Sequence, residues 1–164
     1  MTILQSEYQR FGRSERSKEA PNRLSFEILL VDDEPLILSA LSLCLKDSGH
    51  RVTTALCGQN ALDVLHQKPF DLVITDLNMP GVDGISVLRK AKAIRPKTKI
   101  VIMTGSVLPA STRRLIFSEA NGFLAKPFSL TELHRAVDSC LGSEVLQASP
   151  CRQTPCGSVE ALPP

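Results

Sequence analysis

Short apolar runs and longer amphipathic stretches alternate along the middle of the chain. The apolar runs are rich in Val, Ile, Leu and Thr and are bounded by turn residues, which is typical of β-strands. The predicted strands cover residues 26–31, 51–56, 70–75, 98–103 and 121–125. The first, third and fourth are almost continuously apolar, as expected for strands that are buried on both faces of a parallel sheet.

Each predicted strand is followed by a segment whose apolar residues recur at helical spacing. In the first segment Leu41 and Leu45 share one face, and Gly49 is the expected C-terminal stop. Asp83 and Gly84 are expected to begin the third helix. The periodic positions of the later segments are Ala61, Leu62, Leu65, Ile85, Leu88, Ile94, Leu115, Ile116, Leu130, Leu133, Val137 and Leu141. Five βα units in succession predict an α/β fold with a doubly wound, five-stranded parallel sheet.

The two ends of the chain lack this alternation. Residues 1–25 are polar and charged, and residues 143–164 are rich in Ser, Pro and Gly. Segments with so few periodic apolar positions bury little surface, so we expect a flexible N-terminal leader and a disordered C-terminal tail. Residues 26–142 are expected to form one folded domain. The tail is too short and irregular for a helix-turn-helix, so no output domain is expected within it.

Composition and charge disfavour several classes of partner. The 164 residues include 19 basic and 17 acidic ones, and the net charge of +2 is too small to favour nucleic acid or a membrane surface. The N-terminus lacks the apolar core of a signal peptide, and no apolar run has transmembrane length. Cys44, Cys57 and Cys140 lie in apolar segments, where cysteine behaves as a small hydrophobe. We therefore expect a cytoplasmic protein in a reducing compartment.

Acidic side chains follow two of the predicted strands. The stretch "ILLVDDEP" leads from the first strand into Asp32 and Asp33, and Asp76 directly follows the third strand. Two like charges about 4 Å apart repel by roughly 4 kcal/mol at an effective dielectric constant of about 20, so a cation is expected nearby. A helix cap is the alternative explanation for acidic residues that precede Pro35, because Asp favours caps and Pro favours the first turn.

Two further polar groups follow the fourth and fifth predicted strands, namely the hydroxyl of Thr104 and the ammonium group of Lys126. The carboxyl ends of parallel strands meet at one edge of an open α/β sheet, where ligands bind. We therefore expect these two groups to converge with the three carboxylates. A helix cap alone does not predict this convergence.

This set of groups suits phosphoryl transfer with a magnesium ion. Carboxylate oxygens favour Mg²⁺, and Asp33 would help to hold it. A carboxylate can attack phosphorus and form an aspartyl phosphate when a metal ion and a cation neutralise the transferring group. Lys126 would contact the phosphoryl oxygens, and the hydroxyl of Thr104 would donate a hydrogen bond to one of them.

Four segments of the chain resemble the receiver domain of bacterial two-component response regulators. They are "LLVDDEP", "DLVITDLNMPGVDG", "VIMTG" and "FLAKPF", and the resemblance spans residues 26–142. It implies a flavodoxin-like receiver fold in which Asp76 is the phosphoacceptor and Lys126 assists the transfer. The order of the segments and their strand contexts make the set specific, although each segment is short.

The resemblance also implies a role for five other residues. Asp33 would be a direct Mg²⁺ ligand, Asp32 would support the metal through a water molecule, and Asn78 would offer its backbone carbonyl. Thr104 and Phe123 match the switch hydroxyl and the switch aromatic residue of the family.

The resemblance implies a receiver, and because no output domain is expected in the tail, we expect a single-domain one. It would take its phosphoryl group from a histidine kinase or a phosphotransfer protein and signal by contact with an effector protein. It would catalyse at most its own phosphorylation and dephosphorylation. The expected signalling surface consists of the fourth helix, the fifth strand and the fifth helix, where resembling proteins often bind partners or form homodimers.

Two other functions are considered. Phosphatase-type hydrolases similar to haloacid dehalogenases also use a nucleophilic aspartate, but they carry a second acid two residues later, where this chain has Asn78. A receiver-like module could instead bind partners without being phosphorylated. The complete set of acidic, hydroxyl and basic residues disfavours that alternative.

Overall fold

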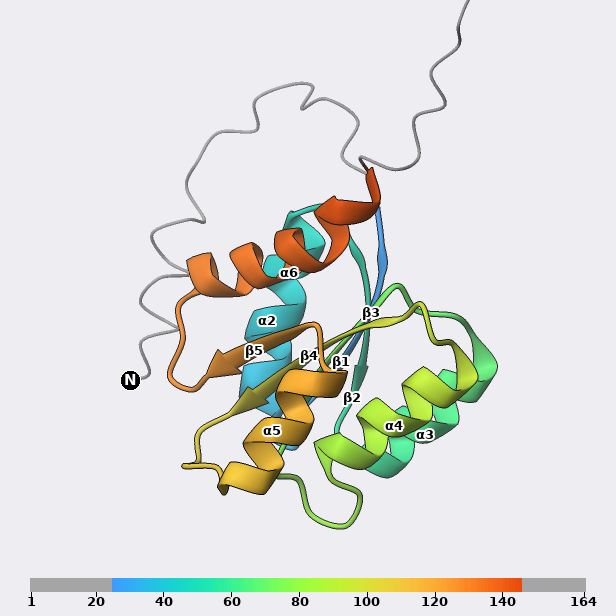
Figure 1. Ribbon diagram of the computed structural model, residues 1–164. Coiled ribbons are helices and arrows are strands. Elements are labelled where there is room, and N and C mark those ends of the chain that lie inside the picture. Colours follow the sequence, from blue (N-terminus) through green and yellow to red (C-terminus); the bar gives the residue numbers. More distant parts are fainter. Residues whose placement is uncertain (1–24, 146–164) are drawn as a thin grey trace, which may run out of the picture.

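The computed structural model describes residues 25–145 and contains five strands and five helices in that range (Figure 1). The strands are β1 (Glu27–Val31), β2 (Arg51–Ala55), β3 (Leu72–Asp76), β4 (Lys99–Thr104) and β5 (Gly122–Ala125). The helices are α2 (Pro35–Asp47), α3 (Gly58–Gln67), α4 (Gly84–Ile94), α5 (Ala110–Glu119) and α6 (Leu130–Val145). In this range no helix has the length and apolar character that a membrane crossing requires.

The five strands form one parallel sheet in the order β2-β1-β3-β4-β5. This order confirms the predicted doubly wound sheet, and it puts the three most apolar strands in the middle. The register sets Val31 opposite Thr75 and Thr104 opposite Ala125. The carboxyl ends of β1, β3, β4 and β5 are therefore nearly level, which brings the residues that follow them to one edge of the sheet.

Helices cover both faces of the sheet (Figure 1). On one face α2 and α6 pack against inward residues such as Leu30, Ile74 and Met103. On the other face α3, α4 and α5 pack against the alternate residues, such as Leu29 and Val73. The alternation follows from the period of two along a strand, because successive side chains point to opposite faces. The core lies beneath the edge of the sheet where the carboxyl ends of the strands meet, and it holds those ends in place.

Three sequence expectations about the helix ends can be compared with the structure. Asp83 caps α4 as expected, since its Oδ1 accepts a hydrogen bond of 2.8 Å from the backbone N–H of Ser86. Cys57 was expected to be a small hydrophobe within an apolar segment, but it caps α3, and its Sγ accepts from the backbone N–H of Asn60 at 3.5 Å. Ile94 was counted as a periodic apolar position but is 42% exposed in the last turn of α4.

The predicted boundaries of the folded domain differ slightly from the described helices. Helix α6 runs to Val145, three residues beyond the expected end of the domain at Gly142. The predicted leader and the rest of the predicted tail lie outside the described residues, apart from Ser25. Autonomous folding of residues 26–142 stays a prediction.

Candidate functional site

Lys126 joins two carboxylates at the edge of the sheet. Its Nζ donates hydrogen bonds of 2.7 Å to Oδ2 of Asp32 and of 2.7 Å to Oδ2 of Asp76. Asp32 directly follows β1, Asp76 ends β3, and Lys126 directly follows β5. The cation expected beside the acidic cluster is therefore present. Lys126 lies 94 residues from Asp32 along the chain, so the fold brings the two together.

The three charged side chains are largely shielded from solvent, which strengthens the electrostatic interactions between them. The side chain of Asp32 has no exposed surface, whereas those of Lys126 and Asp76 are 17% and 9% exposed. Burial raises the pKa of Asp32, and its hydrogen bonds from Lys126 and from the backbone N–H of Glu34 only partly oppose this rise. Burial alone would lower the pKa of Lys126, but its hydrogen bonds to the two carboxylates outweigh burial and raise that pKa.

Asp33 completes a set of three carboxylates that could hold a metal ion. One oxygen from each of Asp32, Asp33 and Asp76 lies within 4.8 Å of the others. Asp33 is exposed, whereas the other two are buried. One ammonium group against three carboxylates leaves an excess of negative charge, which a divalent cation would neutralise. The oxygen-only donor set suits a hard cation such as Mg²⁺.

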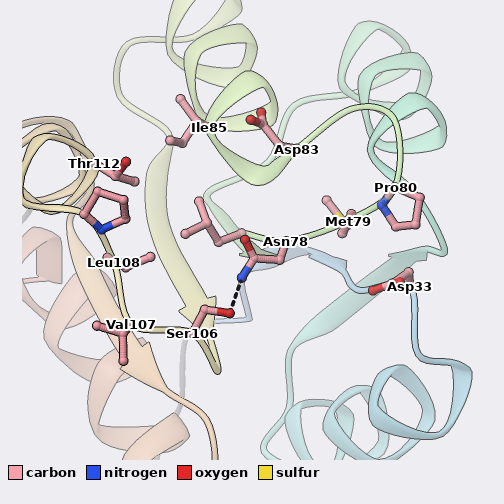
Figure 2. Close-up of a pocket in the computed structure, with 12 residues that line it drawn as sticks. Asp33, Asn78, Met79, Pro80, Asp83, Ile85, Ser106, Val107, Leu108 and Thr112 are labelled. Atoms are coloured by element: carbon pink, nitrogen blue, oxygen red, sulfur yellow. Dashed lines mark hydrogen bonds between the residues drawn. The ribbon is translucent and has the colours of Figure 1, made fainter.

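Asn78 bonds both Asp76 and Thr104. Its backbone N–H donates to Oδ1 of Asp76 at 3.2 Å. Its side-chain Nδ2 donates to Oγ1 of Thr104 at 3.2 Å and to Oγ of Ser106 at 3.0 Å. Figure 2 shows the Asn78 side chain reaching Ser106 across the gap between the two loops. The side-chain bonds of Asn78 and the contribution of Ser106 were not predicted from the sequence, although Ser106 lies two residues after Thr104.

The two residues expected to form a switch lie in different environments. Thr104 is 2% exposed at the end of β4, next to the site. Phe123 on β5 is 37% exposed, and its ring packs against that of Phe117 on α5 with a centroid distance of 6.3 Å. The aromatic side chain is thus directed outward in this structure.

A hollow of about 620 Å³ lies beside the carboxylate cluster (Figure 2). Its walls come mainly from the loops that follow β3 and β4, together with the starts of α4 and α5. Asp33 and Asn78 line it on the side of the cluster. The other lining residues are Leu77, Met79, Pro80, Asp83, Ile85, Ser106, Val107, Leu108, Pro109 and Thr112. The approach to the site from this side is therefore open and partly apolar.

The backbone beneath Asp76 is tightly packed. A Cβ atom on Gly84 would lie 2.2 Å from the carbonyl oxygen of Asp76 and 2.9 Å from the Cα of Leu77. The backbone N–H of Gly84 also donates to the carbonyl of Leu77 at 3.1 Å. Glycine at the start of α4 thus allows the helix to approach the end of β3 closely.

Comparisons with known proteins agree on one protein family. The family model described as "Response regulator receiver domain" matches residues 28–138. The transcriptional regulatory protein GlrR of Escherichia coli strain K12 is 37% identical over 118 residues, which cover 70% of this chain and 26% of that protein. This chain therefore spans about a quarter of the length of that relative.

Two solved structures have the same fold. A response regulator receiver domain protein from Clostridium thermocellum has a TM-score of 0.68 and 29% identity, covering 76% of this chain and 99% of its own. The receiver domain of the sensor histidine kinase PA1611 from Pseudomonas aeruginosa PAO1 has a TM-score of 0.65 and 29% identity, with coverages of 73% and 99%. That second structure is described as holding a magnesium ion in its active site cleft.

Proposed function

This chain belongs to the response regulator receiver family of two-component signalling, and on that premise we propose that Asp76 accepts a phosphoryl group from a phosphohistidine donor. The observation that carries the proposal is the contact of Lys126 Nζ with both Asp32 and Asp76, beside the third carboxylate of Asp33. An oxygen of Asp76 would attack phosphorus while the bond from phosphorus to the histidine nitrogen breaks. The electron pair of that bond would return to the imidazole of the donor.

The proposed magnesium site uses the carboxylate cluster. Asp33 and Asp76 would be direct ligands, Asn78 would add its backbone carbonyl, and Asp32 would act through a water molecule. The clustering of three carboxylates supports this assignment, as does the magnesium ion described for the PA1611 receiver domain. When bound, Mg²⁺ neutralises negative charge on the transferring phosphoryl group. Lys126 would contact the same group from the side of β5.

Magnesium is expected to raise the melting temperature, and Asp33→Asn is expected to remove most of that increase. At a free Mg²⁺ concentration about 100 times the Kd, binding adds about 2.7 kcal/mol to the free energy of unfolding. Thermal unfolding with Mg²⁺ and with chelator measures the effect. Asp138→Asn, an exposed position on α6, is the matched control and should respond like the wild type. An equal magnesium response of Asp33→Asn would contradict the ligand assignment.

A test with two substrates separates the receiver from a hydrolase. The side chain at the position of a hydrolase's general acid is the Asn78 amide, which hydrogen-bonds Thr104 and Ser106. An amide cannot protonate a leaving group, so we expect incorporation of one phosphoryl group per chain from a small phosphodonor. Rapid multiple turnover of a phosphate monoester would favour the hydrolase instead. Failure to incorporate any phosphoryl group would favour a phosphorylation-independent interaction module.

The proposed signal passes through Thr104 and Phe123. A dianionic phosphoryl group on Asp76 would attract the hydroxyl of Thr104, and the space vacated at the end of β4 would admit the ring of Phe123. Such coupling biases two pre-existing arrangements, and its size is limited by how differently they bind the phosphoryl group. The surface that would change consists of α5, β5 and α6, where Phe117 is 69% exposed. We propose that this surface contacts the effector protein or a second copy of the chain.

Thr104→Ala is expected to leave Asp76 able to accept a phosphoryl group while weakening the conformational response. The change removes the hydroxyl but none of the carboxylates or Lys126. The measurement compares NMR shifts of residues 110–140 with and without a phosphoryl mimic, in the wild type and in the variant. If both proteins respond equally, Thr104 does not relay the signal.

A further inference from the structure

The hydroxyl oxygen of Thr104 accepts two hydrogen bonds in this structure. One comes from Nδ2 of Asn78 at 3.2 Å and the other from the backbone N–H of Ser106 at 3.2 Å. A threonine hydroxyl has two lone pairs and one proton, so these bonds use its acceptor capacity and leave the proton for donation. Because Thr104 is 2% exposed, bulk water has little access to this group. The position of the hydroxyl is therefore set by Asn78 and Ser106.

The side chain of Asn78 is itself held at two points. Its Nδ2 carries two hydrogens, and it donates to Oγ1 of Thr104 at 3.2 Å and to Oγ of Ser106 at 3.0 Å. Figure 2 shows the second of these bonds. Its backbone N–H donates to Oδ1 of Asp76. One residue thus bonds the proposed phosphoacceptor through its main chain and the proposed switch hydroxyl through its side chain.

We propose that the Asn78 carboxamide is a positioning residue that retains the Thr104 side chain in its unphosphorylated place. The inference rests on the proposed phosphorylation of Asp76, and it adds a restraint to the switch at that site. Under this proposal, a shift of Thr104 toward a phosphoryl group would lengthen its hydrogen bond to Asn78. That bond therefore belongs to the resting arrangement and opposes the active one. The carboxamide sets how strongly the receiver responds to a given phosphoryl group.

Loss of the carboxamide should then favour the active arrangement. A ligand that binds only this arrangement has an apparent Kd that falls as the population of the arrangement rises. The usual net strength of one protein hydrogen bond corresponds to a change of about two- to tenfold in such a population. Asn78→Ala is accordingly expected to tighten binding of a phosphoryl mimic by about two- to tenfold, although it removes a polar group from the edge of the site.

The test measures the affinity of the full chain for beryllofluoride at saturating Mg²⁺. Asn78→Ala is compared with the wild type, and Asn60→Ala supplies the same substitution at an exposed position of α3. Both Asn78 forms are then repeated in the Thr104→Val background, which removes the hydroxyl but keeps a side chain of similar shape. Tighter binding in Asn78→Ala that is absent in the Thr104→Val background, with Asn60→Ala unchanged, supports the proposal.

Three results would overturn it. Unchanged or weaker beryllofluoride binding by Asn78→Ala would show that the carboxamide does not oppose the active arrangement. Equal tightening in the Thr104→Val background would show that Asn78 does not act through the Thr104 hydroxyl. A wild-type chain that fails to bind beryllofluoride would overturn the proposed function together with this inference, whereas the first two results leave phosphorylation of Asp76 intact.

Discussion

Lys126→Ala is expected to cause a large decrease in the free energy of unfolding and a large decrease in the rate of phosphorylation. The Nζ of Lys126 lies 2.7 Å from a carboxylate oxygen of Asp32 and 2.7 Å from one of Asp76. Removing one partner of a buried ion pair typically costs about 3–5 kcal/mol, because the remaining charge stays buried without compensation. Here two carboxylates would remain, and Asp32 has no exposed surface.

The stability loss in Lys126→Ala should depend on pH with a definite sign. Burial already raises the pKa of Asp32, and without the lysine this pKa should rise further. A carboxyl group with a raised folded-state pKa binds its proton more tightly in the folded than in the unfolded protein. Its stabilising contribution is present below the unfolded pKa and is lost as the pH rises through the folded pKa. The variant should therefore be closest to the wild type in acid and furthest from it near neutral pH.

Urea unfolding at about pH 4.5 and pH 7.5 measures this difference. Lys46→Ala, an exposed lysine in the last turn of α2, is the matched control and should change the free energy of unfolding by less than about 0.5 kcal/mol. The rate of labelling by a small phosphodonor should fall by about 10²- to 10³-fold, as for loss of a donor that stabilises developing charge. A variant that loses stability but is labelled as readily as Lys46→Ala would show that Lys126 is only a structural cation. A variant that matches Lys46→Ala in both measurements would show that Lys126 supports neither the fold nor the transfer.

The fold and the convergence of the charged groups could be predicted because both depend on the period and order of the strands. Apolar runs specify buried strands, and parallel strands deliver the residues after them to one edge. Asp32, Asp76 and Lys126 are therefore brought together by topology, although Lys126 is distant in sequence. The tight packing under Asp76 could not be predicted from the sequence, because a glycine at the start of a helix is also compatible with an ordinary helix start. Its necessity depends on how closely Gly84 approaches the carbonyl of Asp76.

Side-chain partners in the loops could not be predicted in the same way. The bond from Asn78 to Thr104 depends on the relative position of two loops that follow different strands, which no local pattern specifies. The outward position of Phe123 depends on its contact with Phe117, which comes from another element. Cys57 was predicted to be a small hydrophobe because it lies in an apolar segment, yet its position at the start of α3 makes it a cap. Spacing along the chain predicts elements more reliably than it predicts these contacts.

Asp76 is the residue that we propose to carry the phosphoryl group. Its side chain is 9% exposed and hydrogen-bonds Lys126, and it lies with Asp32 and Asp33 in the carboxylate cluster. Asp76→Asn keeps the size of this side chain but removes the nucleophilic carboxylate, so labelling should be abolished. Asp33→Asn should instead retain a weak, magnesium-limited reaction, because Asp76 remains.

The most direct measurement is the intact mass of the wild type and of Asp76→Asn after incubation with a small phosphodonor, with Mg²⁺ or with chelator. We expect a single phosphoryl adduct on the wild type with Mg²⁺, mapped to Asp76 by peptide fragmentation. We expect no adduct on the wild type with chelator and none on Asp76→Asn in either condition. Equal labelling of Asp76→Asn and the wild type would show that Asp76 is not the phosphoacceptor.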